Sequence, residues 1–420
     1  MKDGFYKWFL LLLLSCAFFF HQADRALFGL LTIPIQQDLG LSDVQIGWIN
    51  TVLSWTLAGM ALVAGPVGDR FSRKWIITCS LIAWSLMTLM MGFVGDWRMF
   101  GFVIPAFFVV MFFRSIATGV GESFYGPCYP PLIAAYHRQT RSLALSIHQG
   151  ALYFGLMTSG VITAWMLGFL GSWRHVFMAF GGAGFMLGVV FVFALRDTPR
   201  ATSASAGADT GFLDGMKYFF RTPTAICAMA GFVAIVFVNN AYLFWAPKYM
   251  SMKFGTSVGA AATQTMLWHH LLAFAAILMG GVLTDCMVRK MPRFRMGFQA
   301  VAMLCGAPCL VAIGFLPSAA AMVAMTAAYG VFRGFFEVNT HATLFDVMPA
   351  RHRSTAVGIF TVFAFLFGGL SGVLMGALSQ RYGVRGFEIG FALMGAAYVL
   401  GALFMLFGFF FTFCRDRIDE

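Results

Sequence analysis

Long apolar runs, separated by short charged or Gly/Pro-rich breaks, dominate this chain. Six runs precede a polar stretch near the middle and six follow it. Each run has about the 20 residues that an α-helix needs to cross a bilayer. They cover residues 8–35, 44–68, 75–95, 99–125, 142–168, 174–195, 223–248, 258–284, 294–316, 319–347, 354–379 and 386–413. The pattern predicts an all-α membrane protein with twelve transmembrane helices.

Residues 196–221 interrupt this pattern between the two sets of six runs. The stretch begins RDTPRATSASAGADTG, and its small and polar residues are typical of a flexible linker. We therefore expect an N-terminal six-helix bundle over 1–195, a cytoplasmic linker over 196–221 and a C-terminal six-helix bundle over 222–420. The first run is too long for a secretory signal, since it continues well past Cys16, so we expect it to be a transmembrane helix.

Composition and charge support a membrane protein and indicate its orientation. The 420 residues are 60% hydrophobic and 11% charged, about half the charged fraction of soluble domains. A soluble globular fold is therefore excluded. Lys and Arg are concentrated at the termini, in the linker and in alternate loops, which the positive-inside rule places in the cytoplasm. With short loops and no targeting peptide, we expect a bacterial inner membrane protein with both termini cytoplasmic.

Motifs of enzymes and of ATP-driven pumps are missing from the sequence. There is no phosphate-binding loop ending in GK(S/T) and no HExxH. The eight cysteines are scattered without metal-ligand spacing. We predict a protein that is not an enzyme, with no catalytic residues, no cofactor and no metal, and with no nucleic-acid partner.

A charged motif recurs in the corresponding loop of each half of the chain. The two copies lie 216 residues apart and share Gly, Asp, Arg and Lys at the same spacing. The first copy contains Gly65, Asp69, Arg70, Arg73 and Lys74, and the second contains Gly281, Asp285, Arg289 and Lys290. A repeat of this kind indicates two similar six-helix halves in parallel arrangement.

The first copy resembles the signature loop GxxxDRxGR(R/K) of the major facilitator superfamily, with Ser72 in place of the second glycine. The resemblance covers the whole chain. It implies a monomeric transporter whose halves give alternating access to a central site. It also implies that the glycine permits close helix packing and that the charged residues form a conformational latch. Such a latch is physically plausible, because a carboxylate is stabilised near a helix N-terminus and by an Arg partner.

Two subfamilies are similar to this sequence in more detail. Ala23-Asp24-Arg25, together with Arg114 and the following Gly119-Val120-Gly121-Glu122, looks like the spinster-type lipid transporters. The anion:cation symporters, which take up sugar acids and related anions, share the Asp-Arg pair and an Arg-rich cavity. Residues 125–131 and 148–149 depart from the spinster pattern, so the substrate stays open.

Ionisable residues inside the apolar runs are the candidate functional residues, because charges in a bilayer need a cavity or a partner. In the first run, His21, Asp24 and Arg25 are spaced i, i+3 and i+4, which predicts one shared polar face. The fourth and tenth runs each carry a polar stripe at equal offsets. The stripes contain Arg114 and Glu122 in the fourth run and Arg333, Glu337 and His341 in the tenth.

Three intramembrane arginines predict an anion site. Arg25, Arg114 and Arg333 are always charged, and we expect them to bind a carboxylate or phosphate from facing walls of one central cavity. The alternative is that each arginine neutralises a neighbouring carboxylate. Further substrate contacts are predicted from His21, His148, Gln149, Tyr153, Asn239, Asn240, His269 and His341, although polar residues in membrane helices also serve as helix-to-helix hydrogen bonds.

Carboxylates in the same runs are the predicted proton carriers. Burial disfavours a charged carboxylate and a nearby arginine favours it, so alternation between the two couples protonation to conformation. The candidates are Asp24, Glu122 and Glu337. We therefore predict proton-coupled symport of a small organic anion such as a sugar acid. Spinster-like transport of a lysolipid or sphingolipid, coupling to sodium, uniport, and a sensor that keeps the fold without transport stay as alternatives.

Overall fold

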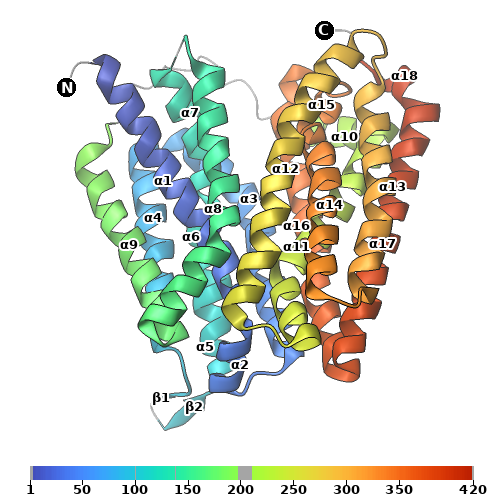
Figure 1. Ribbon diagram of the computed structural model, residues 1–420. Helices are drawn as coiled ribbons and strands as arrows, with labels where there is room; N and C mark the ends of the chain where they lie inside the picture. Colours follow the sequence, from blue (N-terminus) through green and yellow to red (C-terminus); the bar gives the residue numbers. More distant parts are fainter. Residues whose placement is uncertain (1–2, 100, 138, 197–210, 419–420) are drawn as a thin grey trace. The chain divides into compact units, whose positions relative to one another are not determined.

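The computed structural model describes residues 3–99, 101–137, 139–196 and 211–418 (Figure 1). Most of the predicted linker, residues 197–210, lies outside the described residues, as does the side chain of Asp69. Within the described residues, twelve helical segments are long and apolar enough to cross a membrane. The prediction of an all-α protein with twelve spans is confirmed.

The chain divides into two compact units. Unit 1 contains residues 1–201 and 243–267, and unit 2 contains residues 202–242 and 268–420. The end of α11 (Pro223–Phe254) and the start of α12 (Val258–Val288) therefore belong to unit 1. The predicted bundles, by contrast, were divided at residues 195 and 222, and that division stays a prediction.

Unit 1 is built mainly from nine helical elements of the first half. They are α1 (Asp3–Leu30), α2 (Thr32–Leu39), α3 (Asp43–Arg70), α4 (Arg73–Met90), α5 (Ala106–Val110), α6 (Thr118–Ser123), α7 (Tyr125–Tyr136), α8 (Arg141–Leu170) and α9 (Trp173–Ala194), with the single turn η1 (Met91–Phe93) and the π-helix η2 (Met111–Ala117) between them. Side-chain caps start several helices: Ser42 forms a capping box on α3 and Ser72 caps α4. Ser72, which replaces the motif glycine, is thus the N-cap of the third span.

Helix packing in unit 1 pairs α1 with α8 and α4 with α9. A buried core of large side chains, including Tyr6, Trp84, Tyr125 and Phe191, joins these helices. A short antiparallel hairpin, β1 (Trp97–Met99) and β2 (Phe102–Ile104), lies at the end of the unit opposite the start of α1 (Figure 1).

The fourth span differs from the predicted run over 99–125. The hairpin occupies its first residues, and the helix begins at Ala106, directly after Pro105, where Asp96 Oδ1 accepts from the Ala106 amide at 2.7 Å. The span continues to Tyr136. Its middle is the π-helix η2, a feature that is frequent at functional sites and that a period of 3.6 residues does not predict.

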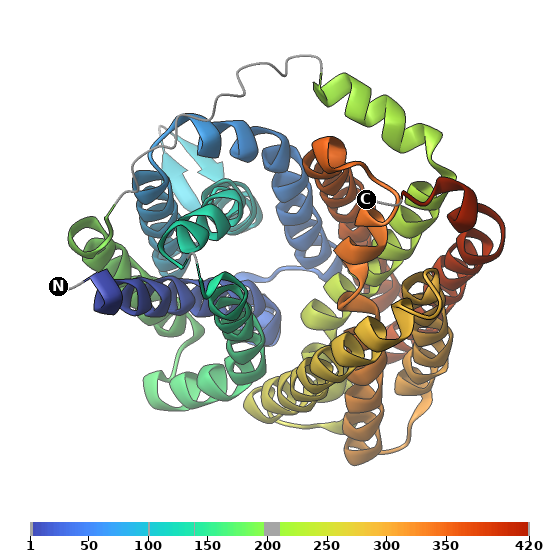
Figure 2. The same cartoon turned by 90° about the horizontal axis from the view of Figure 1, so that it is seen from above.

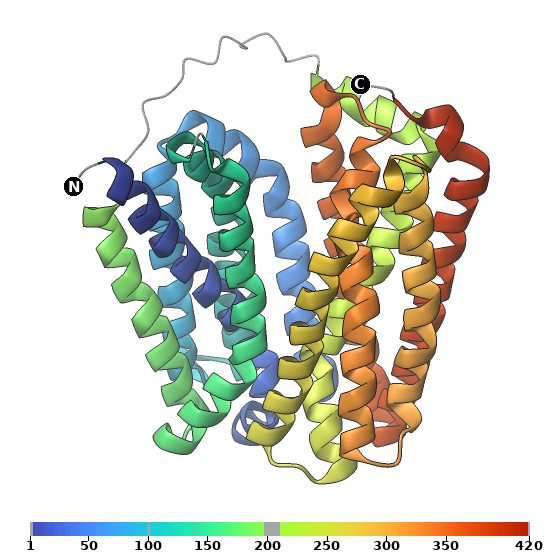
Figure 3. The ribbon, with the colours of Figure 1, turned by 45° about the horizontal axis from the view of Figure 1, so that its top comes forward.

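Unit 2 contains the helices of the second half and one helix from the linker. They are α10 (Gly211–Arg221), the first part of α11, most of α12, α13 (Phe294–Phe315), α14 (Ala319–Glu337), α15 (Thr340–Phe345), α16 (Arg353–Tyr382), α17 (Val384–Phe407) and α18 (Phe413–Asp416), with the turn η3 (Ala350–His352) and the π-helix η4 (Gly408–Thr412). α13 packs along α14 and α17 (Figure 3). The tenth span breaks at Val338–Asn339, so the predicted continuous stripe ends at Glu337.

The last part of the predicted linker is a helix. α10 runs along the rim of unit 2 and contacts α16 (Figure 2). Its Phe219 is fully buried, whereas Phe212, Leu213 and Phe220 are exposed. The composition of 196–221 as a whole predicts flexibility, but Gly211–Arg221 has apolar and polar residues at the spacing of an amphipathic helix.

Candidate functional site

A cluster of charged side chains is buried where α1 meets the π-helix and α6 in unit 1. Glu122 on α6 lies 3.5 Å from Arg25 Nε through its Oε2 atom. Arg114 on η2 donates from Nη2 to the Arg25 carbonyl oxygen at 3.0 Å, and its guanidinium lies 5.8 Å from the Phe28 ring. Arg25, Arg114 and Glu122 therefore lie together within unit 1.

His21 joins this cluster through one ring nitrogen. Its Nδ1 lies 3.0 Å from the Gln22 side-chain nitrogen. Because an amide nitrogen donates, Nδ1 accepts and the neutral ring carries its hydrogen on Nε2. That Nε2 faces Glu122 Oε2 at 3.5 Å. The His21 ring also lies beside two aromatic rings, Phe18 and Tyr125, each at a centroid distance of 6.0 Å.

Several polar atoms of this cluster are buried without a hydrogen-bond partner among the described residues. They are His21 Nε2, Arg114 Nη1, Glu122 Oε1 and Glu122 Oε2. A buried polar atom left unpaired costs about 1–3 kcal/mol, and more if it is charged. Three side chains that converge with open donors and acceptors are therefore suited to binding a small polar group or a proton.

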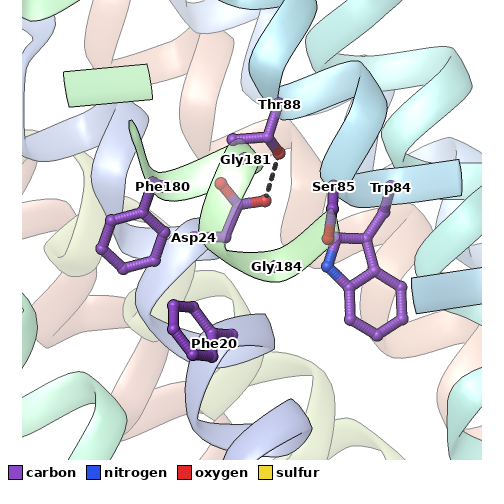
Figure 4. Close-up of a pocket in the computed structure, with 8 residues that line it drawn as sticks. All are labelled: Phe20, Asp24, Trp84, Ser85, Thr88, Phe180, Gly181 and Gly184. Carbon is purple, nitrogen blue, oxygen red and sulfur yellow. Dashed lines mark hydrogen bonds between the residues drawn. The ribbon is translucent and has the colours of Figure 1, made fainter. Parts of the chain in front are cut away.

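The Asp24 carboxylate points to a different wall from Arg25, which differs from the predicted single polar face. Adjacent helical residues point about 100° apart, so Arg25 faces Glu122 while Asp24 faces α4 and α9. Thr88 Oγ1 donates to Asp24 Oδ2 at 2.9 Å. Figure 4 shows the small cavity around this carboxylate. Its lining residues are Phe20, Asp24, Trp84, Ser85, Thr88, Phe180, Gly181 and Gly184.

The predicted contacts from the fifth span divide between core and surface. His148 is fully buried, and its Nε2 lies 3.0 Å from the Tyr125 hydroxyl. Its ring stacks on Tyr129 at 4.0 Å, so the geometry is that of a core residue. Tyr153 is also buried. Gln149 is exposed on the other side of α8, because consecutive residues turn by about 100°.

Unit 2 holds a second charged cluster around Arg333 on α14. Arg333 Nη2 lies 3.3 Å from Glu337 Oε2, and Arg333 Nη1 lies 3.0 Å from His269 Nε2. Tyr329 and Tyr398 join their hydroxyls at 3.0 Å beside it. Of the other predicted contacts in this unit, Asn239 and Asn240 are half-buried, and His341 is exposed next to Phe232.

Lys248, at the end of the seventh predicted run, is a buried charge. It lies in the part of α11 that belongs to unit 1. Its Nζ is paired with Asp43 Oδ1 and donates to Gln36 Oε1 at 2.6 Å. The side chains of Lys248 and Asp43 are only 8% and 13% exposed. The sequence signal for this buried charge was the position of Lys248 within an apolar helical run.

The predicted latch loops carry their charges at the protein surface. Arg70, Asp285, Arg289 and Lys290 are exposed, and Arg73 and Lys74 are half-exposed. The expectation that Gly65 permits close packing is wrong, because a Cβ there would meet nothing within 4 Å. Gly68 has that role instead: a Cβ would lie 3.1 Å from Cys128 Sγ. At Gly281 a Cβ would make only an ordinary contact with Val338.

Twelve membrane spans with buried charge clusters define an integral membrane protein of the transporter type. The chain belongs to the major facilitator superfamily, whose model matches residues 13–372. It is a transporter and not an enzyme. The resemblance drawn from the signature loop is confirmed.

Similar proteins fall into both of the predicted subfamilies. Protein spinster homolog 1 of Xenopus laevis is 27% identical over 373 residues, which are 83% of this chain and 68% of that protein. Probable galactarate/D-glucarate transporter GarP of Escherichia coli strain K12 is 26% identical over 311 residues, 68% of each chain. The crystal structure of a bacterial homologue of the human lysosomal transporter Spinster matches with a TM-score of 0.83 and 19% identity over 99% of both chains.

Proposed function

We propose that this transporter takes up a small organic anion, with a dicarboxylic sugar acid as the substrate class, in symport with protons. The observation that carries the proposal is the buried Arg114 guanidinium, whose Nη1 has no hydrogen-bond partner among the described residues. A carboxylate pairs with such a donor in a strong, charge-assisted hydrogen bond. Similarity to a galactarate/D-glucarate transporter supports the same substrate class.

Arg25, Arg114 and Arg333 bind the negative groups of the substrate in this proposal, and His21 contributes its Nε2 atom. Glu122 competes with the anion for Arg25, so a proton on Glu122 releases the arginine for the substrate. Asp24 and Glu337 are the further proton carriers, in contact with Thr88 and Arg333. The membrane is a bacterial inner membrane, with both termini and the charged latch loops on the cytoplasmic side.

A second candidate function is spinster-like transport of a lysolipid. An apolar groove on unit 1 favours it, because the groove has the character of an acyl-chain site. Its lining residues are Val67, Ile76, Cys79, Ser80, Ala83, Met87, Phe112, Ala117, Val120, Gly121 and Phe124. Gly121 lines the groove and packs against Trp84. Since Gly121 directly precedes Glu122, an acyl chain in the groove would lie close to the buried charges.

Ligand-induced thermal stabilisation of the purified protein tests the proposal against this second candidate. D-glucarate is expected to raise the melting temperature, since a ligand at a hundred times its Kd stabilises by about 2.7 kcal/mol. Arg114→Gln is expected to weaken that binding about tenfold to a hundredfold, because it removes a charged hydrogen bond. The matched control is Arg98→Gln in the exposed hairpin, which should bind as the wild type does. Stabilisation by lysophospholipid alone would replace the proposal with the second candidate.

A further inference from the structure

His269 on α12 has both of its ring nitrogens in contact with α14. Its Nδ1 lies 3.0 Å from the carbonyl oxygen of Thr326, and its Nε2 lies 3.0 Å from Arg333 Nη1. The side chain has no exposed surface. The ring is therefore held on both edges and presents neither nitrogen to a ligand.

These two neighbours determine which ring nitrogen carries the hydrogen. A carbonyl oxygen can only accept, so Nδ1 must donate. A guanidinium can only donate, so Nε2 must offer its lone pair. One neutral tautomer meets both requirements. A second proton on the ring would point an N–H at the Arg333 guanidinium and would remove this hydrogen bond.

The charged and titratable groups around the ring come from four helices. They are His270 on α12, Tyr242 on α11, Tyr329 and Arg333 on α14 and, behind these, Glu337 on α14 and Tyr398 on α17. Arg333 is always cationic and is the group bonded to the ring. Glu337 pairs with the other terminal nitrogen of Arg333, so it contacts His269 only through that arginine. This surrounding favours an uncharged imidazole.

We propose that His269 is a positioning residue that holds Arg333 in place for an anionic substrate, and that it neither touches the substrate nor carries the coupled proton. The inference rests on the proposed function and deepens it. His269 and Glu337 hold the two terminal nitrogens of one planar group. A donor fork that is ordered before the ligand arrives loses less freedom on binding, which favours affinity.

Nitrogen-15 NMR of the full-length protein, labelled at histidine and placed in lipid nanodiscs, tests the tautomer without any substrate. The signals that disappear in His269→Gln belong to His269. We expect them at the shifts of a neutral ring with hydrogen on Nδ1, unchanged from pH 5.5 to pH 8. Arg333→Met should move the Nε2 signal, because it removes the donor. A doubly protonated ring in this range, or an Nε2 signal that ignores Arg333→Met, would overturn the inference.

Binding of D-glucarate to the same protein tests the positioning role. His269→Phe is expected to raise the Kd about tenfold, because Arg333 loses the hydrogen bond that holds its Nη1 atom. His269→Gln should recover most of the affinity, since its amide oxygen can accept from Arg333, and it should keep the wild-type pH dependence. His175→Phe is the control, with an exposed imidazole on α9 removed, and should keep the wild-type Kd.

An unchanged Kd in His269→Phe, or a lost pH dependence in His269→Gln, contradicts the positioning role. Failure of the wild type to bind D-glucarate or any other small anion is a different result. It would overturn the proposed function, while the NMR measurement would still decide the state of the His269 ring.

Discussion

Glu122 lies between a histidine and an arginine in the buried charged cluster of unit 1. Its Oε2 atom lies 3.5 Å from both Arg25 Nε and His21 Nε2, and neither oxygen has a hydrogen-bond partner among the described residues. In the proposed function, the charge on this carboxyl changes how strongly Arg25 is neutralised inside the protein. Glu122 is therefore the residue at which the proposal links a proton to the substrate.

Glu122→Gln is expected to remove the pH dependence of anion binding. In the wild type, acid protonates Glu122, frees Arg25 and tightens D-glucarate binding, by about tenfold between pH 7.5 and pH 5.5 if one charged hydrogen bond is regained. Glutamine mimics the protonated carboxyl, so the variant should bind tightly at both pH values in isothermal titration calorimetry. Asp38→Asn, which removes an exposed carboxylate paired with Arg174, is the control and should keep the wild-type profile. A pH profile that persists in Glu122→Gln would remove Glu122 from proton coupling.

α4 and α9 pack closely and form part of the wall of the cavity that surrounds Asp24. Gly181 and Gly184 on α9 line this cavity together with Ser85 and Thr88 on α4 (Figure 4). A Cβ at Gly181 would overlap the backbone of Ser85 and Leu89. The glycines therefore allow α4 and α9 to approach closely beside the Asp24 carboxylate, which a larger residue would prevent.

Gly181→Ala is expected to destabilise the protein by about 1–3 kcal/mol, the usual cost of overpacking. Gly182→Ala is a matched control at the adjacent position, where a Cβ would meet nothing within 4 Å. It should leave stability unchanged or slightly higher, because alanine favours a helix over glycine. Thermal melting in detergent separates the two variants. Equal melting temperatures for both would show that the α4–α9 contact relaxes more easily than its geometry suggests.

At the scale of the whole molecule, the sequence predicted the spans well because hydropathy follows from local composition. Twelve apolar runs correspond to twelve spans, and the repeated loop motif identified the superfamily. The side-chain geometry was less predictable. Helical spacing grouped Asp24 with Arg25, but the 100° between them directs Asp24 towards α4. The π-helix around Arg114 and the break at Val338–Asn339 depend on tertiary contacts that no periodicity contains.

Contacts between buried residues far apart in the chain could not be predicted from the sequence either. Lys248 and Asp43 lie 205 positions apart, so their pairing could not be inferred from local patterns. His148, predicted as a substrate contact, is part of an aromatic stack with Phe18 and Tyr129. The neighbours of both residues are brought together by folding, so their surroundings could not be predicted from the sequence.

Proton movement driven by D-glucarate is the most direct test of the central claim, that this transporter couples anion uptake to protons. Wild-type protein is reconstituted into liposomes that enclose a pH-sensitive dye, and D-glucarate is added outside without a pH gradient. Symport predicts that the lumen becomes more acidic as the anion enters, and that Arg114→Gln slows this acidification strongly. Entry of radiolabelled D-glucarate without any change of internal pH would contradict proton coupling, and the absence of any D-glucarate entry would contradict the proposed substrate class.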